Sequence, residues 1–255
     1  MNGLAFCYVL FYSVNFSMKK FSLFIDKNKS GSFHMQRDLS LFQKCEAKDD
    51  LYVICIYSFY PPCISLGYSQ KEEKEIDMQK AKSLGWEVVK RPTGGGIVFH
   101  NTAEITYSLI MPAENPILPK GLISSYLFIS EAVVIALKSI GIKADIKQQT
   151  PDHRQQITNR RQPGLCFSYP AEHEIVVEGK KVVGSAQKRG KNAILQQGSI
   201  FVRKSDERIF SVLKRPFKRY NAISVEEVLG REVVFDEIKY ALTQGFKERL
   251  GISLK

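Results

Sequence analysis

The feature that most constrains the fold is a series of short β-branched and aromatic runs, several of which are joined directly by turns. In EIVVEGKKVVGSAQKR (174–189), a Glu-Gly pair separates two such runs, a pattern typical of a β-hairpin. Further strand patterns lie at 50–59, 105–112 and 193–202. Helical spacing of apolar residues occurs at 32–47, with Ser32 as a possible N-cap, and at 71–85, 121–141 and 235–252.

Strands and helices do not alternate regularly along the chain, so a parallel βαβ arrangement is not indicated. We expect an α/β (α+β) fold with a mixed, largely antiparallel sheet flanked by helices. The polar stretch 147–164 is interpreted as a loop within one domain, because strand patterns resume directly after it.

The segment RPTGGGIVFH (91–100) places three glycines before a strand, where glycine weakens packing. Because glycine has no Cβ, such a run lets main-chain N–H groups approach a phosphate, a carboxylate or a developing oxyanion. Arg91 would add a charged fork for the same groups. The alternative is a bulge or bend where two backbones cross. The pattern is neither G-x-G-x-x-G nor a Walker motif, which excludes those nucleotide sites.

The net charge of +11 favours an acidic partner, which could be nucleic acid, an anionic membrane or an acidic protein. No nucleic-acid-binding signature occurs, so nucleic acid is not expected. The five cysteines are scattered without a CxxC pair, which predicts neither a metal site nor a disulfide framework and fits a reducing cytoplasm.

The first 17 residues are apolar but interrupted, and they lack the positive start of a signal peptide. They are also shorter than the ~20 residues of a membrane span. We interpret residues 1–17 as an N-terminal extension, either sequence upstream of a start at Met18 or a buried first strand. Residues 18–255 are expected to form a single domain, without stable membrane association.

Four motifs in order resemble signatures of the biotin/lipoate A/B protein ligase superfamily, in its lipoate-protein ligase A and cysteine-type octanoyltransferase branch. They are PPCISLGYSQ (61–70), KRPTGGGIVFHN (90–101), EIVVEGKKVVGSA (174–186) and LQQGSI (195–200). The resemblance extends from about Phe33 to near the C-terminus. It implies a catalytic domain similar to biotin protein ligases and class II aminoacyl-tRNA synthetases. Asn101 and Gln197 depart from the family pattern, which has aspartate and histidine there.

The resemblance also implies which residues form the acyl pocket. They are Arg91, Gly94, Gly95, Gly96, Ile97, Val98, Phe99, His100, Gly184, Ser185, Ala186, Gly198 and Ser199. Lys181 corresponds to the lysine that holds the acyl carbonyl or the activated phosphate, where its ammonium would stabilise developing negative charge. From spacing alone, Lys181 would be a solvated hairpin lysine. For His100, a direct role in the pocket and a hydrogen-bonded structural role at a strand end both stay open.

Cys166 decides between two chemistries. CFSYPAEHE (166–174) resembles the C-F-x-x-P-S/A-x-x-E pattern of the cysteine-type octanoyltransferases, which implies a thiol nucleophile. The expected function is then octanoyl transfer from acyl carrier protein to a protein lysine through a Cys166 thioester, without a cofactor. One alternative is a lipoate-protein ligase that uses free lipoate, ATP and Mg²⁺ and forms lipoyl-AMP. Another is a non-catalytic binding homologue. For Cys166 itself, the alternative to a nucleophile is a buried structural cysteine.

The implied acceptors are lipoyl domains of 2-oxoacid dehydrogenase complexes and the H protein of glycine cleavage. These partners and acyl carrier protein are generally acidic, so a basic face would speed encounter. The candidates for that face are Lys147, Arg154, Arg160 and Arg161. We expect a cytoplasmic enzyme.

Overall fold

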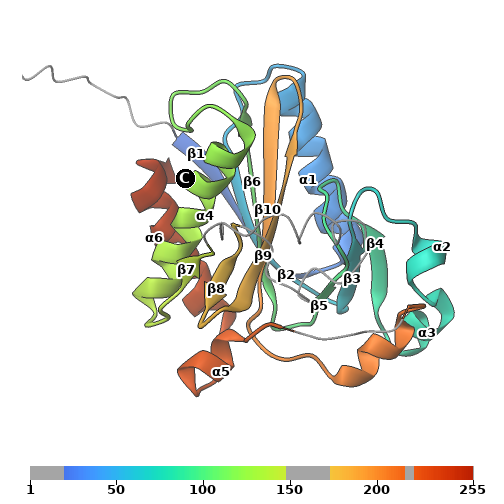
Figure 1. Cartoon of the computed structure of the whole chain (residues 1–255). Helices are drawn as coiled ribbons and strands as arrows, with labels where there is room; N and C mark the ends of the chain where they lie inside the picture. The colour runs from blue at the N-terminus through green and yellow to red at the C-terminus, as the bar shows by residue number, and fades with distance from the viewer. Residues whose placement is uncertain (1–19, 148–172, 216–220, 255) are drawn as a thin grey trace, which may run out of the picture.

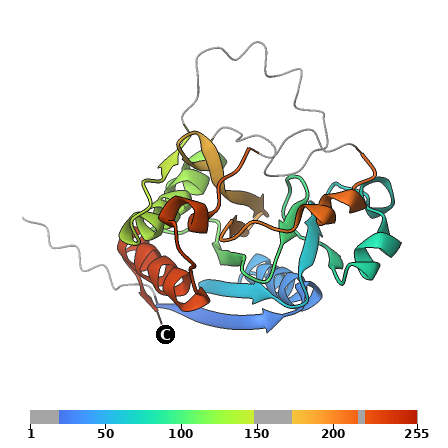
Figure 2. The same cartoon turned by 90° about the horizontal axis from the view of Figure 1, so that it is seen from below.

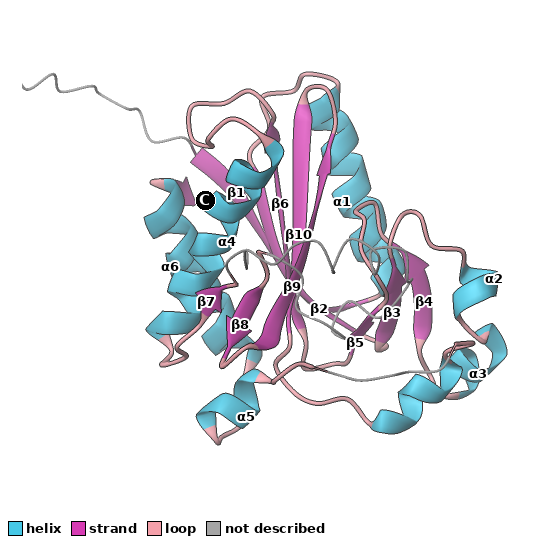
Figure 3. Cartoon of the chain, in the orientation of Figure 1, coloured by secondary structure: helices cyan, strands magenta, loops and turns pink. Residues whose placement is uncertain are grey.

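The computed structural model describes residues 20–147, 173–215 and 221–254, which form two sheets with helices around them (Figure 1). The eight-stranded sheet has the order β11-β1-β2-β6-β10-β9-β8-β7, and the three-stranded sheet has the order β4-β3-β5. Within these two sheets of the described residues, only the β1–β2, β1–β11 and β3–β4 pairs are parallel. The expected mixed, largely antiparallel sheet is therefore confirmed, as Figure 3 shows by element type.

The strands are β1 Lys20–Lys29, β2 Val53–Phe59, β3 Cys63–Leu66, β4 Glu87–Lys90, β5 Val98–His100, β6 Ile105–Pro112, β7 Asp145–Ile146, β8 Ile175–Val177, β9 Lys180–Arg189, β10 Ala193–Ile200 and β11 Ser253–Leu254. The helices are α1 Gly31–Glu46, α2 Glu72–Glu75, α3 Met78–Ser83, α4 Leu122–Ser139, α5 Val225–Leu229 and α6 Phe235–Leu250, with a 3₁₀ helix at Glu207–Val212.

The large sheet is covered on both faces. Apolar side chains of α4 and α6 pack on one face against β1, β2, β6, β9 and β10. Side chains of α1 pack on the other face, where Met35 and Phe42 contact the centre of the sheet. In Figure 2, α4 and α6 lie together at one side of the molecule, and α2, α3 and the small sheet lie at the other. Burial of both faces explains why β2 and β10 are apolar or uncharged at every position.

Helix α4 has the length and apolar composition of a membrane span, and it is a core helix here. It crosses α6 closely at Gly245, where an added Cβ would lie 2.2 Å from the carbonyl oxygen of Ala132. Glycine in the middle of a helix lowers its intrinsic stability. In this helix it is required by the approach of the two backbones.

The predicted hairpin at 174–189 is confirmed as β8 and β9, with Glu178 and Gly179 at positive φ in the turn. The helix expected at 71–85 is wrong as one element. It divides into α2 and α3 because Ile76 bridges to Leu213, and the Asp77 side chain accepts from Lys80 N to cap a new helix.

Two smaller differences concern the N-terminal half. The N-cap of α1 is Ser30 rather than Ser32: its hydroxyl accepts from Phe33 N at 3.2 Å. The amides of Gly31 and Ser32 instead donate to the carboxylate of Glu87. Strand β1 was not predicted, because its sequence KFSLFIDKNK does not alternate cleanly between apolar and polar residues.

Candidate functional site

A cleft lies between the small sheet on one side and strands β9 and β10 with helix α1 on the other. Its cavity volume is about 30 Å³, far below the ~300–1,000 Å³ of typical small-molecule sites, so the cleft is narrow. Its lining residues are Met35, Tyr57, Ser65, Arg91, Val98, His100, Thr106, Gly184, Ser185, Ala186, Gln197, Gly198 and Ser199.

The structure brings most of the predicted pocket residues to this cleft. It places Ile97 and Phe99 elsewhere, in an apolar cluster of the small sheet with Ile64 and Leu66. The physical reason is the alternation of side chains along a strand, which turns Val98 and His100 to the cleft and their neighbours away from it. Gly94–Gly96 form a partly exposed loop beside the cleft, and they do not line it.

Arg91 holds this glycine loop in place. Its guanidinium donates to the carbonyl oxygens of Gly94 at 2.8 Å and Gly96 at 2.6 Å. A second arm donates to the carbonyl oxygen of Ser65 at 2.9 Å and to its hydroxyl at 3.1 Å. The sequence interpretation gave Arg91 the task of binding an anion. In the structure its fork satisfies backbone carbonyls, so it shapes the rim of the cleft.

The glycine run allows two backbones to cross. A Cβ on Gly67 would lie 2.0 Å from the carbonyl oxygen of Gly95, and no rearrangement of side chains could relieve that contact. Gly95 itself has φ +94°, a conformation that L side chains rarely adopt. These contacts match the alternative in which the glycines serve a close backbone approach.

A chain of hydrogen bonds runs along the floor of the cleft. His100 Nε2 lies 2.8 Å from Ser65 Oγ, and its Nδ1 lies 3.2 Å from Ser199 Oγ. The Ser199 hydroxyl donates to Glu104 Oε1 at 2.7 Å. With Arg91 donating to Ser65, the chain links Glu104 to the glycine loop.

Burial controls the protonation of this chain. Desolvation holds the pKa of His100 well below its ordinary value, so the ring is neutral. Desolvation also raises the pKa of Glu104 from 4.5 to about 8, and its Oε2 is buried without a hydrogen-bond partner. His100 matches the hydrogen-bonded structural histidine of the sequence analysis, and both its ring nitrogens are engaged.

A second polar cluster was missed by sequence reasoning. Asp38 of α1 is fully buried and accepts from Tyr57 Oη at 2.9 Å and from Gln197 Nε2 at 2.8 Å. Gln197 Oε1 in turn accepts from Thr93 at 2.7 Å. Desolvation raises the pKa of Asp38. A signal was available, because Asp38 shares a helical face with Met35 and Phe42, an unusual place for a carboxyl group.

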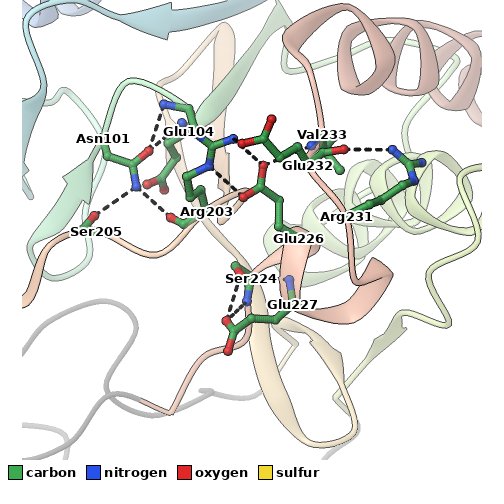
Figure 4. A network of polar contacts seen from close by, with 11 residues as sticks. Asn101, Glu104, Arg203, Ser205, Ser224, Glu226, Glu227, Arg231, Glu232 and Val233 are labelled. Carbon is green, nitrogen blue, oxygen red and sulfur yellow. Dashed lines mark hydrogen bonds and ion pairs between the residues drawn. The ribbon is translucent and has the colours of Figure 1, made fainter.

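Gln197, which replaces the family histidine, thus connects α1 to the loop before the glycines. Asn101, the other departure, closes a turn instead (Figure 4). Its Oδ1 accepts from the amides of Ala103 and Glu104, and its Nδ2 donates to Arg203 O at 2.7 Å. Neither residue is placed as a general base.

Lys181 is fully buried, so the interpretation as a solvated hairpin lysine is wrong. Its ammonium forms an ion pair with Glu174, which is 8% exposed. On β9 it lies three residues from Gly184, the nearest cleft residue of that strand, and it does not line the cleft. The amide of Lys147 donates to Glu174 O at 2.9 Å. The Lys181–Glu174 ion pair therefore lies beside the end of β7 and the start of β8.

Cys166, Arg154, Arg160 and Arg161 lie outside the described residues, as does the extension 1–17. Cys45, Cys55 and Cys63 are buried, which confirms their structural interpretation, and burial raises the pKa of Cys55 to about 12. Within the described ranges, no group of three His, Cys, Asp or Glu side chains is arranged to hold a metal ion.

Comparison with known proteins gives a consistent result. The model of the lipoyl protein ligase A/B catalytic domain matches residues 30–247. Octanoyltransferase LipM of Anoxybacillus flavithermus is 35% identical over 244 residues, covering 91% of this chain and 87% of that protein. Octanoyltransferase LipM of Bacillus subtilis is 34% identical over 244 residues, covering 91% and 87%.

Solved structures show the same fold. A lipoate-protein ligase A bound with ATP superposes with a TM-score of 0.75 at 23% identity, covering 93% of this chain and 88% of that one. A bi-partite lipoate protein ligase from Thermoplasma acidophilum gives a TM-score of 0.70 at 22% identity, covering 93% and 86%.

Proposed function

Because the chain belongs to the lipoyl protein ligase A/B catalytic domain family, we propose that it is an octanoyltransferase of protein lipoylation, which attaches an octanoyl group to the lysine of a lipoyl domain. The observation that carries this proposal is the identity of about a third to LipM octanoyltransferases over nine-tenths of the chain. The cleft is consistent with it, because its lining combines the apolar side chains of Met35 and Val98 with polar groups that can hydrogen-bond a carbonyl oxygen.

The reaction proceeds in two acyl transfers. The Cys166 thiolate attacks the thioester carbonyl of octanoyl-acyl carrier protein, a carbon–sulfur bond forms, and the carrier thiolate leaves. The neutral amine of the acceptor lysine then attacks the Cys166 thioester. An amide forms, the Cys166 sulfur leaves, and the proton lost by the amine balances its charge. No phosphate bond is broken, so neither ATP nor Mg²⁺ is required.

The residues around the cleft shape the site in which the acyl group is transferred. The Arg91 network fixes the glycine loop and the rim, and neutral His100 holds Ser65 and Ser199 in the floor. His100 is 4% exposed with both nitrogens engaged, so we assign it to positioning rather than proton transfer.

Lys181 is assigned to stabilising the oxyanion that develops on the acyl carbonyl. In support, its buried ammonium pairs with Glu174, which follows Cys166 by eight positions in the sequence. Because Lys181 does not line the cleft, this role requires the oxyanion to form toward the β8–β9 end of it.

The acceptors are lipoyl domains, including the H protein of glycine cleavage, and the enzyme works in the cytoplasm without nucleic acid or stable membrane contact. The decisive experiment incubates the purified protein with octanoyl-acyl carrier protein in the absence of ATP. We expect a hydroxylamine-labile octanoyl adduct by mass spectrometry, which is absent in Cys166→Ala and present in Cys7→Ala.

Addition of a lipoyl domain should then move the octanoyl group to its lysine. Modification that needs free lipoate, ATP and Mg²⁺ would instead identify a lipoate ligase. A protein that binds octanoyl-acyl carrier protein without any transfer would be the non-catalytic homologue.

A further inference from the structure

Two lysines flank one exposed tyrosine beside the cleft. The Nζ atom of Lys90 lies 5.9 Å from the centroid of the Tyr68 ring, and that of Lys188 lies 5.1 Å from it. Tyr68 is 65% exposed. Lys188 also lies 5.4 Å from the ring of Phe42, so it is held between two aromatic rings. We call Tyr68, Lys90 and Lys188 the lysine–tyrosine surface.

The lysine–tyrosine surface carries positive charge that the protein does not neutralise locally. Across the described ranges, no carboxylate forms an ion pair with Lys90 or Lys188, although many other cations have one. Both ammonium groups lie within 6 Å of one ring, so two like charges are kept close together. Aromatic faces attract cations and hold these side chains in place without cancelling their charge.

This surface is next to residues that line the cleft. Lys90 directly precedes Arg91, and Lys188 lies two residues from Ala186 on the same side of β9; both neighbours line the cleft. Tyr68 follows Gly67, which touches the glycine loop, and its amide donates to Thr93 O at 2.9 Å. The lysine–tyrosine surface therefore borders the cleft lining at Arg91 and Ala186.

We propose that the lysine–tyrosine surface docks the acidic face of the carrier protein that delivers the acyl chain as a thioester, an inference that rests on the proposed function. Opposite charge on the carrier complements the two ammonium groups, and the exposed Tyr68 ring provides contact area that few other side chains give an interface. The whole chain, at +11, adds a long-range attraction in the same direction.

The donor fits this surface better than the acceptor does. A thioester enters the cleft without charge, whereas the acceptor brings an ammonium group past Lys90 and Lys188. Like charges repel each other, so the surface disfavours the approach of the acceptor's lysine ammonium, even though the rest of a lipoyl domain is acidic. The partner of the lysine–tyrosine surface is therefore the carrier protein that bears the thioester.

The test compares Lys90→Glu/Lys188→Glu with Lys80→Glu/Lys82→Glu, which changes the net charge equally at exposed positions of α3 on the outer side of the small sheet (Figure 1). Each variant is assayed with octanoyl-acyl carrier protein and with octanoyl-pantetheine, a small uncharged donor. Lys90→Gln/Lys188→Gln serves as a milder second variant. Direct binding of octanoyl-acyl carrier protein is measured in parallel and does not depend on turnover.

We expect the Lys90/Lys188 charge reversal to raise KM and Kd for the carrier-bound donor about ten-fold or more at low salt. The salt dependence of KM should weaken, and KM for octanoyl-pantetheine should stay unchanged. The Lys80/Lys82 variant should resemble wild type. Equal effects on both donors, equal effects in both variants, or a rise in KM for the lipoyl domain alone would overturn the proposal. Carrier binding that depends on Lys90 and Lys188 without any transfer would support the surface while the proposed function fails.

Discussion

The pH dependence of stability offers a quantitative test of Glu104, which ends the buried chain of hydrogen bonds beneath the cleft. Its carboxyl group has no exposed surface, and desolvation raises its pKa from 4.5 to about 8. Between these values the unfolded chain has released a proton that the folded protein still holds. The free energy of unfolding therefore falls as the pH rises, and the loss is complete only above about pH 8.

The magnitude follows from the pKa values. One pKa unit corresponds to about 1.4 kcal/mol, so Glu104 should remove about 2 kcal/mol of stability between pH 6.5 and pH 8. Buried His34 and His100 have lowered pKa values and act in the opposite direction, but only below their unfolded value of 6.5. The window above pH 6.5 isolates the carboxyl group from them.

Glu104→Gln keeps the shape and the acceptor for Ser199 and removes the titration. Urea unfolding at several pH values should show the variant gaining about 2 kcal/mol relative to wild type between pH 6.5 and pH 8. Glu248→Gln, at an exposed position of α6, serves as the matched control and should follow wild type. A constant difference between Glu104→Gln and wild type across this window would refute the argument that Glu104 is protonated by burial.

Two further predictions concern packing and the buried ion pair. Lys181→Met should lower the free energy of unfolding by about 3–5 kcal/mol, because it leaves Glu174 charged and buried. In urea unfolding, the double variant Lys181→Met/Glu174→Leu should recover most of that loss. Its activity should stay low. A double variant with full activity would remove Lys181 from the chemistry. Gly245→Ala should cost about 1–3 kcal/mol, because its Cβ would meet the Ala132 backbone, whereas Gly94→Ala meets nothing within 4 Å and should leave the melting temperature unchanged.

Local patterns were sufficient for much of the fold. The hairpin of β8 and β9, strand β6 and helix α4 follow from periodicity and turn residues, which act over a few neighbouring residues. The motifs also located most of the cleft lining. They could not show that Ile97 and Phe99 face the small-sheet cluster, because the family resemblance marks a segment and the strand alternation assigns each face.

The sequence by itself determined the strand-rich architecture through local patterns and the family through the resemblance of its four motifs. Only the tertiary structure decided what individual polar groups do. Arg91 binds the loop carbonyls, Lys181 is buried against Glu174, and Asp38 meets Gln197 across more than 150 positions of sequence. The physical reason is that burial and partner choice depend on which distant segments pack together, and these two quantities set the charge and the hydrogen bonding of every polar group in the cleft.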